Sequence, residues 1–360
     1  MTETLRSILA YIVDLGVLVF FHELGHYLAA RSQGVVVEAF SIGFGPSLVS
    51  WKAKSGTVWK ISALPLGGYV KMQGWGEPNN NEPALPGSFS ATSLGSKALI
   101  VAAGPIANLI LAFVLFAGLF MTVGQVVVQP VFSSILPNSP AAAAGLQSGD
   151  RVLAVNAAPI KDFAQLQDII VAHPDAPLAF TLNRHGHVLT QQVTLGDAEM
   201  DGQKIGHLGV AGDESAIRHF SPPAALAAAA QETWTDSRTM LTGLYNLVVH
   251  RQGLHDLAGP LGIAQITGKV AAMGLISVIN LIALLSINLG LINLVPIPIL
   301  DGGHLLFYAA EAIYGRPIPP RAMDIGLRFG VAIILSLFFV TTFNDLTRLG
   351  AVSWVAHLFG

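Results

Sequence analysis

Two histidines and a glutamate inside an apolar stretch are the residues best placed to do chemistry. The segment His22-Glu23-Leu24-Gly25-His26 lies within the apolar run from Leu5 to Ala30. On a helix, residues four apart share one face, so both imidazoles can reach one zinc ion. Burying such side chains in lipid is costly unless they are paired or ligated. The motif therefore predicts a zinc-dependent protease that works within a membrane.

Glu23 is the expected general base in this interpretation. It would take a proton from a water molecule that zinc activates, and pass it to the leaving amine. A catalytic zinc also needs a third protein ligand and one open position. The chain contains no cysteine, so that ligand must be a histidine, an aspartate or a glutamate.

A second polar segment, Asn293-Leu-Val-Pro-Ile-Pro-Ile-Leu-Asp-Gly-Gly-His304, supplies two candidates for the third ligand. Its two prolines interrupt the preceding apolar helix, and its adjacent glycines permit a tight turn. Asp301 could complete the zinc site, or it could only cap the next helix. His304 is the competing ligand, although a role in supporting a ligand is also open to it. Asp14, earlier in the first apolar stretch, is a polar packing residue or a further site residue.

The composition predicts that a polytopic α-helical membrane protein positions these residues. The chain of 360 residues is 52% hydrophobic and only 11% charged, whereas soluble domains carry about 25% charged residues. Four apolar stretches are long enough to span a bilayer, at about 5–30, 97–121, 273–295 and 325–343. We expect the first to be a retained helix rather than a cleaved signal peptide. The absence of a basic stripe argues against a nucleic-acid partner.

Lysine and arginine residues predict the orientation of these helices. Six of them lie between the first two stretches or at the start of the second, and two more lie between the last two: Arg31, Lys52, Lys54, Lys60, Lys71, Lys97, Arg316 and Arg321. Because short basic loops face the cytoplasm, we expect both termini and residues 122–272 to lie outside.

The chain divides into four predicted parts: 1–121, 122–213, 214–272 and 273–360. Within the first, residues 35–74 are expected to form a β-hairpin region associated with the membrane, followed by a loop at 74–87. The segment Gly145-Leu-Gln-Ser-Gly-Asp150, with strands and a helix near 163–172 after it, resembles a PDZ domain inserted between the second and third membrane helices. Residues 221–250 are expected to form one or two helices at the outer membrane surface.

Together these motifs resemble the site-2 protease family, and more closely its bacterial RseP-type members. The resemblance rests on H-E-L-G-H at 22–26, N-x-x-P-x-P-x-L-D-G at 293–302, one PDZ-like insert, and segments such as Gly259-Pro-Leu-Gly-Ile263. It covers essentially the whole chain. Some relatives carry two PDZ domains, and this chain has the motif for one, so a filter that needs two is in doubt.

The resemblance implies zinc (Zn²⁺) on His22, His26 and Asp301, with Glu23 as the catalytic carboxylate. It also implies that Asn293 holds the substrate backbone or the developing oxyanion, and that Gly67-Gly68 belongs to a hairpin that pairs with an unwound substrate. The implied substrates are single-span membrane proteins, such as anti-sigma factors or signal-peptide remnants, in the bacterial inner membrane. The PDZ domain would exclude bulky proteins or bind a free C-terminus.

Two other classes of function compete with this interpretation. A membrane scaffold with a degenerate catalytic site would bind protein tails through its PDZ domain, but the intact Glu23 argues against it. A metal transporter could also carry histidine and aspartate within its helices. A transport path needs polar residues on both sides of the bilayer midplane, and here they cluster near one face.

Overall fold

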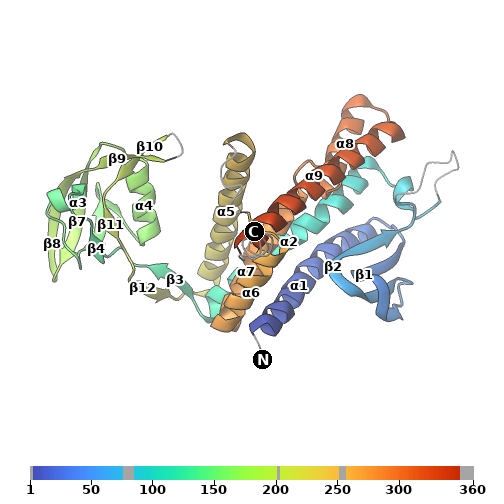
Figure 1. Cartoon of the computed structure of the whole chain (residues 1–360), viewed down its shortest axis with the longest axis horizontal. Coiled ribbons are helices and arrows are strands. Elements are labelled where there is room, and N and C mark those ends of the chain that lie inside the picture. Colours follow the sequence, from blue (N-terminus) through green and yellow to red (C-terminus); the bar gives the residue numbers. More distant parts are fainter. Residues whose placement is uncertain (1–2, 76–84, 201–202, 251–256, 349–360) are drawn as a thin grey trace, which may run out of the picture. The chain divides into compact units, whose positions relative to one another are not determined.

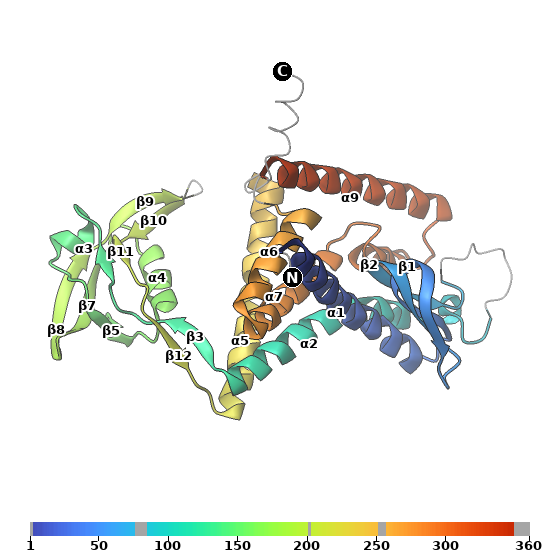
Figure 2. The ribbon, with the colours of Figure 1, turned by 60° about the horizontal axis from the view of Figure 1, so that its bottom comes forward.

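The computed structural model describes residues 3–75, 85–200, 203–250 and 257–348, which divide into two compact units. Unit 1 comprises residues 1–119 and 223–360, and unit 2 comprises residues 120–222. The longer helices, shown in Figures 1 and 2, are α1 (Glu3–Ser32), α2 (Leu94–Thr122), α5 (Pro222–Tyr245), α6 (Pro260–Met273), α7 (Leu275–Asn293), α8 (Asp301–Tyr314) and α9 (Pro320–Arg348). Unit 1 also contains two short helical segments, η1 (Phe89–Ala91) and η2 (Asn246–His250).

Four helices, α1, α2, α7 and α9, are long and apolar enough to cross a membrane. Each contains one of the apolar stretches seen in the sequence. The third stretch needs one adjustment at its start, because Met273 is the last residue of α6 rather than part of α7. Gly274 separates the two helices with φ 110°, a backbone conformation that favours glycine.

Small residues let α1, α2 and α7 approach closely. A β-carbon on Gly25 of α1 would collide with the backbone of Ala103 and with Ala107 in α2. Gly290 of α7 lies against α2 in the same way, because a β-carbon there would be 2.9 Å from the carbonyl oxygen of Pro105. Such close backbone approach is the usual packing of membrane helices. It brings the polar residues of the three helices within hydrogen-bonding distance.

The hairpin β1 (Val37–Lys52) and β2 (Val58–Met72) packs beside α1. Both strands bend, so residues 37–42 of β1 pair with 68–72 on one side and with 58–61 on the other. Phe40, fully buried, packs between rings of α1 and Trp59, which stacks on it at 4.2 Å. Within the described residues no further strand pairs with 68–72. The second half of β2 is therefore a sheet edge. The loop expected at 74–87 lies mostly outside the described residues.

Helix α6 is held by its neighbours at both ends. Near its start, the backbone N–H groups of Gly259 and Gly262 donate to the buried carboxylate of Asp345 in α9, at 3.0 and 2.9 Å. Near its other end, Arg6 of α1 donates to the carbonyl oxygen of Gly268 at 3.2 Å. Since α6 packs along α1, these contacts help to fix α1, which carries the histidine motif.

Unit 2 is a small β-rich domain. Its antiparallel sheet has the order β6-β5-β7-β8, formed by β5 (Arg151–Val155), β6 (Ala158–Pro159), β7 (Pro177–Arg184) and β8 (His187–Thr194). The other strand pairs are β3 (Gln125–Val128) with β12 (Ser215–Arg218), β4 (Ser134–Ile135) with β11 (Val210–Ala211), and β9 (Gly196–Met200) with β10 (Gln203–His207). Helices α3 (Pro140–Ala143) and α4 (Phe163–Val171) complete it, and its core includes Phe132, Leu166 and Phe180.

A buried ion pair organises the Gly145–Asp150 motif of unit 2. Asp150 is fully buried and accepts hydrogen bonds from Arg184 at 2.7 and 2.6 Å and from the backbone N–H of Gln147 at 2.9 Å. Burial by itself would raise the pKa of Asp150, but these hydrogen bonds outweigh burial and hold its pKa below the usual value. The motif is therefore a structural turn of this domain.

Candidate metal centre

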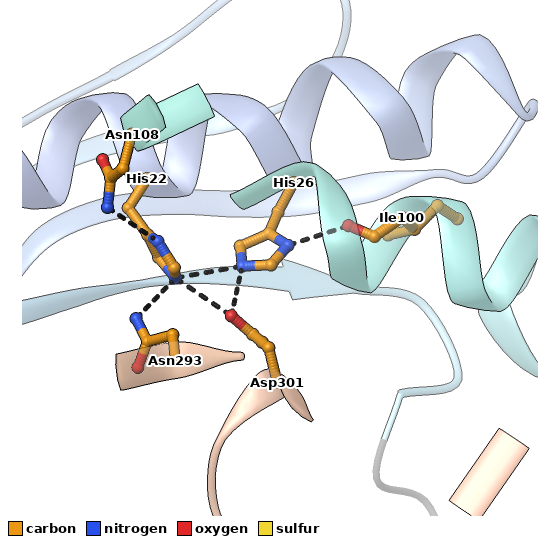
Figure 3. Close-up of polar contacts among 6 residues, drawn as sticks. All are labelled: His22, His26, Ile100, Asn108, Asn293 and Asp301. Atoms are coloured by element: carbon orange, nitrogen blue, oxygen red, sulfur yellow. Dashed lines mark hydrogen bonds and ion pairs between the residues drawn. The ribbon is translucent and has the colours of Figure 1, made fainter. Parts of the chain in front are cut away.

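Three side chains from distant parts of the sequence converge in unit 1 (Figure 3). Nε2 of His22 lies 3.2 Å from Nε2 of His26 and 3.2 Å from Oδ2 of Asp301. Nε2 of His26 lies 3.5 Å from the same carboxylate oxygen. Both histidines are buried. The helical spacing predicted from the sequence thus places both rings on one face, and the start of α8 brings Asp301 to them.

The arrangement fits a tetrahedral zinc ion. Ligand atoms at the usual zinc distances of about 2.0–2.1 Å are separated from one another by about 3.3–3.4 Å in a tetrahedron. The three separations given above, 3.2, 3.2 and 3.5 Å, agree with that spacing. The charges also match, because the carboxylates of Asp301 and Glu23 would balance a divalent cation in an apolar environment. Two nitrogens and one oxygen are a donor set that catalytic zinc uses.

Helix α2 supplies a hydrogen-bond partner to each histidine. Nδ1 of His26 lies 2.9 Å from the carbonyl oxygen of Ile100, so Nδ1–H donates and leaves Nε2 free to bind a metal. Nδ1 of His22 lies 3.2 Å from Nδ2 of Asn108, which is fully buried. Neither α2 residue was predicted as a site residue. A polar residue in an apolar helix was the only signal for Asn108, and a backbone carbonyl such as that of Ile100 has no sequence signal.

Asp301 belongs to the candidate ligand cluster and does not occupy the cap position of α8. It is the first residue of α8, and Leu300 before it occupies the cap position without a side-chain hydrogen bond. The following glycines make the turn possible, because β-carbons on Gly302 and Gly303 would overlap the backbone of Leu294 and of Ile297. The Asp301 carboxylate can therefore turn toward α1.

Glu23 lies at the edge of β2. It is half-buried, and its carboxylate interacts with the backbone N–H of Val70. Gly68 is even closer to α1, since a β-carbon there would lie 2.6 Å from Val19 and 3.1 Å from Cγ of Glu23. Gly67 next to it has φ 117° and faces the ring of Phe44. The strand edge and the glutamate thus lie beside the candidate ligand cluster.

Asn293, the last residue of α7, also faces this site. Its Nδ2 lies 3.4 Å from Nε2 of His22 (Figure 3). Because that nitrogen is the one turned toward the metal position, the Asn293 amide lies beside the ligand cluster, where it can donate a hydrogen bond to a bound molecule. Its placement is suited to holding a carbonyl oxygen near the metal.

His304 and Asp14 do not join the ligand cluster formed by the described residues. The His304 ring packs against Trp75 at 5.8 Å and Tyr308 at 6.5 Å between ring centres. Asp14 is 1% exposed, and neither of its carboxylate oxygens has a hydrogen-bond partner among the described residues. His304 and Asp14 therefore lie outside the cluster of His22, His26 and Asp301.

Comparisons with known proteins point to one family. The sequence model of peptidase family M50 matches residues 10–337. A protein of Agrobacterium fabrum named as a zinc metalloprotease is 38% identical, covering 95% of this chain and 96% of its own. The zinc metalloprotease RasP of Geobacillus kaustophilus is 33% identical, covering 97% and 99%. A PDZ domain of a Listeria innocua SdrC-like protein covers 25% of this chain and 99% of its own, with 13% identity and a TM-score of 0.22.

Proposed function

Since the chain belongs to peptidase family M50 and is a zinc metalloendopeptidase, we propose that it cleaves peptide bonds within the membrane spans of single-span proteins. One observation carries the proposal: the ligand cluster is built on α1, a helix apolar enough to cross a membrane, and its two histidines are buried. A water-dependent site at this depth suits substrates that are themselves embedded in lipid.

His22, His26 and Asp301 would hold the zinc ion. When bound, zinc activates water and polarises the carbonyl group of the scissile bond. Glu23 is placed to take the proton from the attacking water and to deliver it to the leaving nitrogen. Asn293 would donate its amide N–H to the carbonyl oxygen of the substrate as negative charge develops there. The closeness of both residues to the ligand cluster supports these roles.

The edge of β2 would bind the substrate backbone. A membrane helix hides its amides in internal hydrogen bonds, so cleavage requires unwinding and new partners for the freed groups. The edge of a sheet offers such partners by strand addition. The edge at 68–72 lies beside Glu23, which supports this site for the scissile region. The small Gly67-Gly68 segment would let the substrate backbone approach the glutamate.

Residues 122–213 would limit which substrates reach the site. We assign them as a PDZ-like domain that either excludes bulky extracytoplasmic regions or binds a free C-terminal peptide. The order of the elements and the compactness of unit 2 support the assignment. Membrane lipid and single-span substrates are the proposed partners.

The proposed orientation places the β1–β2 hairpin on the cytoplasmic side of the bacterial inner membrane and unit 2 outside. The basic residues of the short loops support it. The cysteine-free chain permits a direct test with the exposed positions Ser55→Cys and Asp213→Cys. In intact spheroplasts a membrane-impermeant maleimide should label only Asp213→Cys, and Ser55→Cys should react after permeabilisation. The reverse pattern would contradict the orientation.

The central experiment compares the wild type with Glu23→Gln in lipid vesicles that contain a tagged single-span substrate. Glu23→Gln should keep bound zinc and lose cleavage, since only the proton acceptor is removed. Asp301→Ala should lose both. Glu199→Gln, the same chemical change at an exposed position of unit 2, is the matched control. Cleavage by Glu23→Gln at the wild-type rate would contradict the mechanism, and zinc transport into vesicles without cleavage would favour a transporter.

A further inference from the structure

The position of Asn108 beside a metal ligand has a functional consequence. We propose that Asn108 is a positioning residue, which holds the His22 ring in the tautomer whose Nε2 binds zinc. The inference rests on the proposed zinc site. Its basis is the contact of 3.2 Å between the Asn108 amide and Nδ1 of His22. The other ring nitrogen of His22, Nε2, faces Asp301.

A neutral histidine carries its proton on only one ring nitrogen. When Nε2 of His22 binds a metal, the proton must lie on Nδ1, and Nδ1–H needs a hydrogen-bond acceptor because it is buried. Among the described residues, the side chain that lies within hydrogen-bonding distance of Nδ1 is that of Asn108. An apolar residue at 108 would leave this donor without a partner.

The Asn108 amide can serve both neutral tautomers of His22. In Figure 3 its Nδ2 faces Nδ1 and its oxygen is turned away. In this arrangement Nδ2 donates to Nδ1, and Nε2–H can donate to Asp301. Oδ1 of Asn108 is buried without a hydrogen-bond partner among the described residues. A half-turn of the amide exchanges oxygen and nitrogen, which occupy nearly the same volume, and lets Nδ1–H donate to Oδ1.

Packing of α7 against α2 fixes the place from which this amide acts. The Ser286 hydroxyl in α7 donates to the backbone carbonyl of Asn108 at 2.8 Å. A β-carbon on Gly290 would lie 3.3 Å from Cβ of Asn108. The same helix ends at Asn293, whose amide faces the other nitrogen of His22. The backbone and Cβ of Asn108 are therefore held, and rotation of the terminal amide is the freedom that remains.

The test measures zinc affinity of the purified full-length protein in lipid nanodiscs by competition with a chelator. Asn108→Leu keeps the number and branching of the side-chain heavy atoms but removes the acceptor, and should weaken zinc binding by about 10–100-fold. Asn108→Asp keeps an acceptor and should bind zinc within a few-fold of the wild type. Asn280→Leu, at an exposed position of α7, is the matched control. Thermal unfolding of the zinc-free proteins checks that each variant is folded.

A role in packing alone predicts a different pattern, because Leu fills the space as well as Asn does. Wild-type zinc affinity in Asn108→Leu would overturn the inference. If Asn108→Leu fails to fold, Asn108→Asp still tests the proposed role of Asn108. A loss of zinc affinity of about 10-fold or more in Asn108→Asp would also overturn that role. His22→Ala separates this inference from the zinc site itself: if the wild type binds no zinc, or His22→Ala binds it normally, the proposed site is wrong.

Discussion

The ring of His26 lies directly over the α-carbon of Gly104, where a β-carbon would overlap three of its ring atoms. Helix α2 thus gives His26 two things, a carbonyl partner from Ile100 and the space in which the ring lies. Any side chain at position 104 must displace the ring of His26, which we propose as a metal ligand. The close packing of α1 and α2 is therefore part of the construction of the site.

The first prediction concerns this contact. Gly104→Ala should displace the His26 ring and weaken zinc binding by about 10–100-fold. Loss of a hydrogen-bond partner that orients a metal ligand has an effect of this size. Competition with a chelator measures the effect. Gly118→Ala on the same helix is the control, because a β-carbon there meets no atom within 4 Å. Equal zinc affinities for the two variants would show that the His26 ring can adjust at no cost.

The second prediction separates substrate geometry from metal binding. A β-carbon on Gly68 would press on Val19, on the backbone of Ser41 and on Glu23. Gly68→Ala should therefore shift Glu23 against the strand edge and lower the cleavage rate by about 100-fold, since small misplacements have effects of this size. Bound zinc should stay at the wild-type level. Gly16→Ala, with open space around it, should cleave normally. Loss of zinc in Gly68→Ala would contradict this division of roles.

The third prediction is a pH dependence of unit 2. The folded state lowers the pKa of Asp150, so this carboxylate contributes stability that is fully present above its unfolded pKa of about 3.9. That contribution should be lost as the pH falls through the lower folded pKa. Hydrogen exchange of residues 120–222 in the full chain should therefore accelerate in acid.

Asp150→Asn is the variant that tests the source of this dependence. It should destabilise unit 2 by about 1.5–3 kcal/mol at pH 7, because the charge-assisted hydrogen bonds from Arg184 are lost while Arg184 itself remains partly exposed to solvent. It should also flatten the acid response. An acid response of the same size in Asp150→Asn would assign the effect to other groups. Asp213→Asn, at an exposed carboxylate of the same unit, is the control.

The fourth prediction concerns Asp14. Its carboxyl group is buried without a hydrogen-bond partner among the described residues, and such a group destabilises the fold by about 1–3 kcal/mol. Asp14→Ala should raise the free energy of unfolding by a similar amount and keep cleavage. Asp14→Asn should raise the free energy of unfolding only slightly, because a polar group stays buried at this position. Thermal unfolding and the cleavage assay together test this. Lost cleavage in a stable Asp14→Ala variant would instead give the carboxyl group a part in the reaction.

Much of the fold followed from local patterns. Apolar length alone identified the four helices that could span a membrane, because the bilayer sets that length. Period-two runs and glycine breaks indicated the β1–β2 region. The bend that pairs 37–42 with both halves of β2 had no local signal, since strand pairing depends on contacts made elsewhere. The separation of α6 from α7 depended on a single glycine, Gly274, which the sequence analysis did not single out.

The amino-acid sequence by itself determined that His22 and His26 share a face, because four residues are close to one helical turn. It also determined that a polar Asp301 follows a helix broken by prolines. Only the tertiary structure brought the carboxylate of Asp301 within 3.2 Å of His22, and placed Asn108 and the carbonyl of Ile100 beside the two histidines. The physical reason is that a metal site is a matter of distances between side chains, and these distances arise from the packing of α1, α2 and α8 rather than from any one segment.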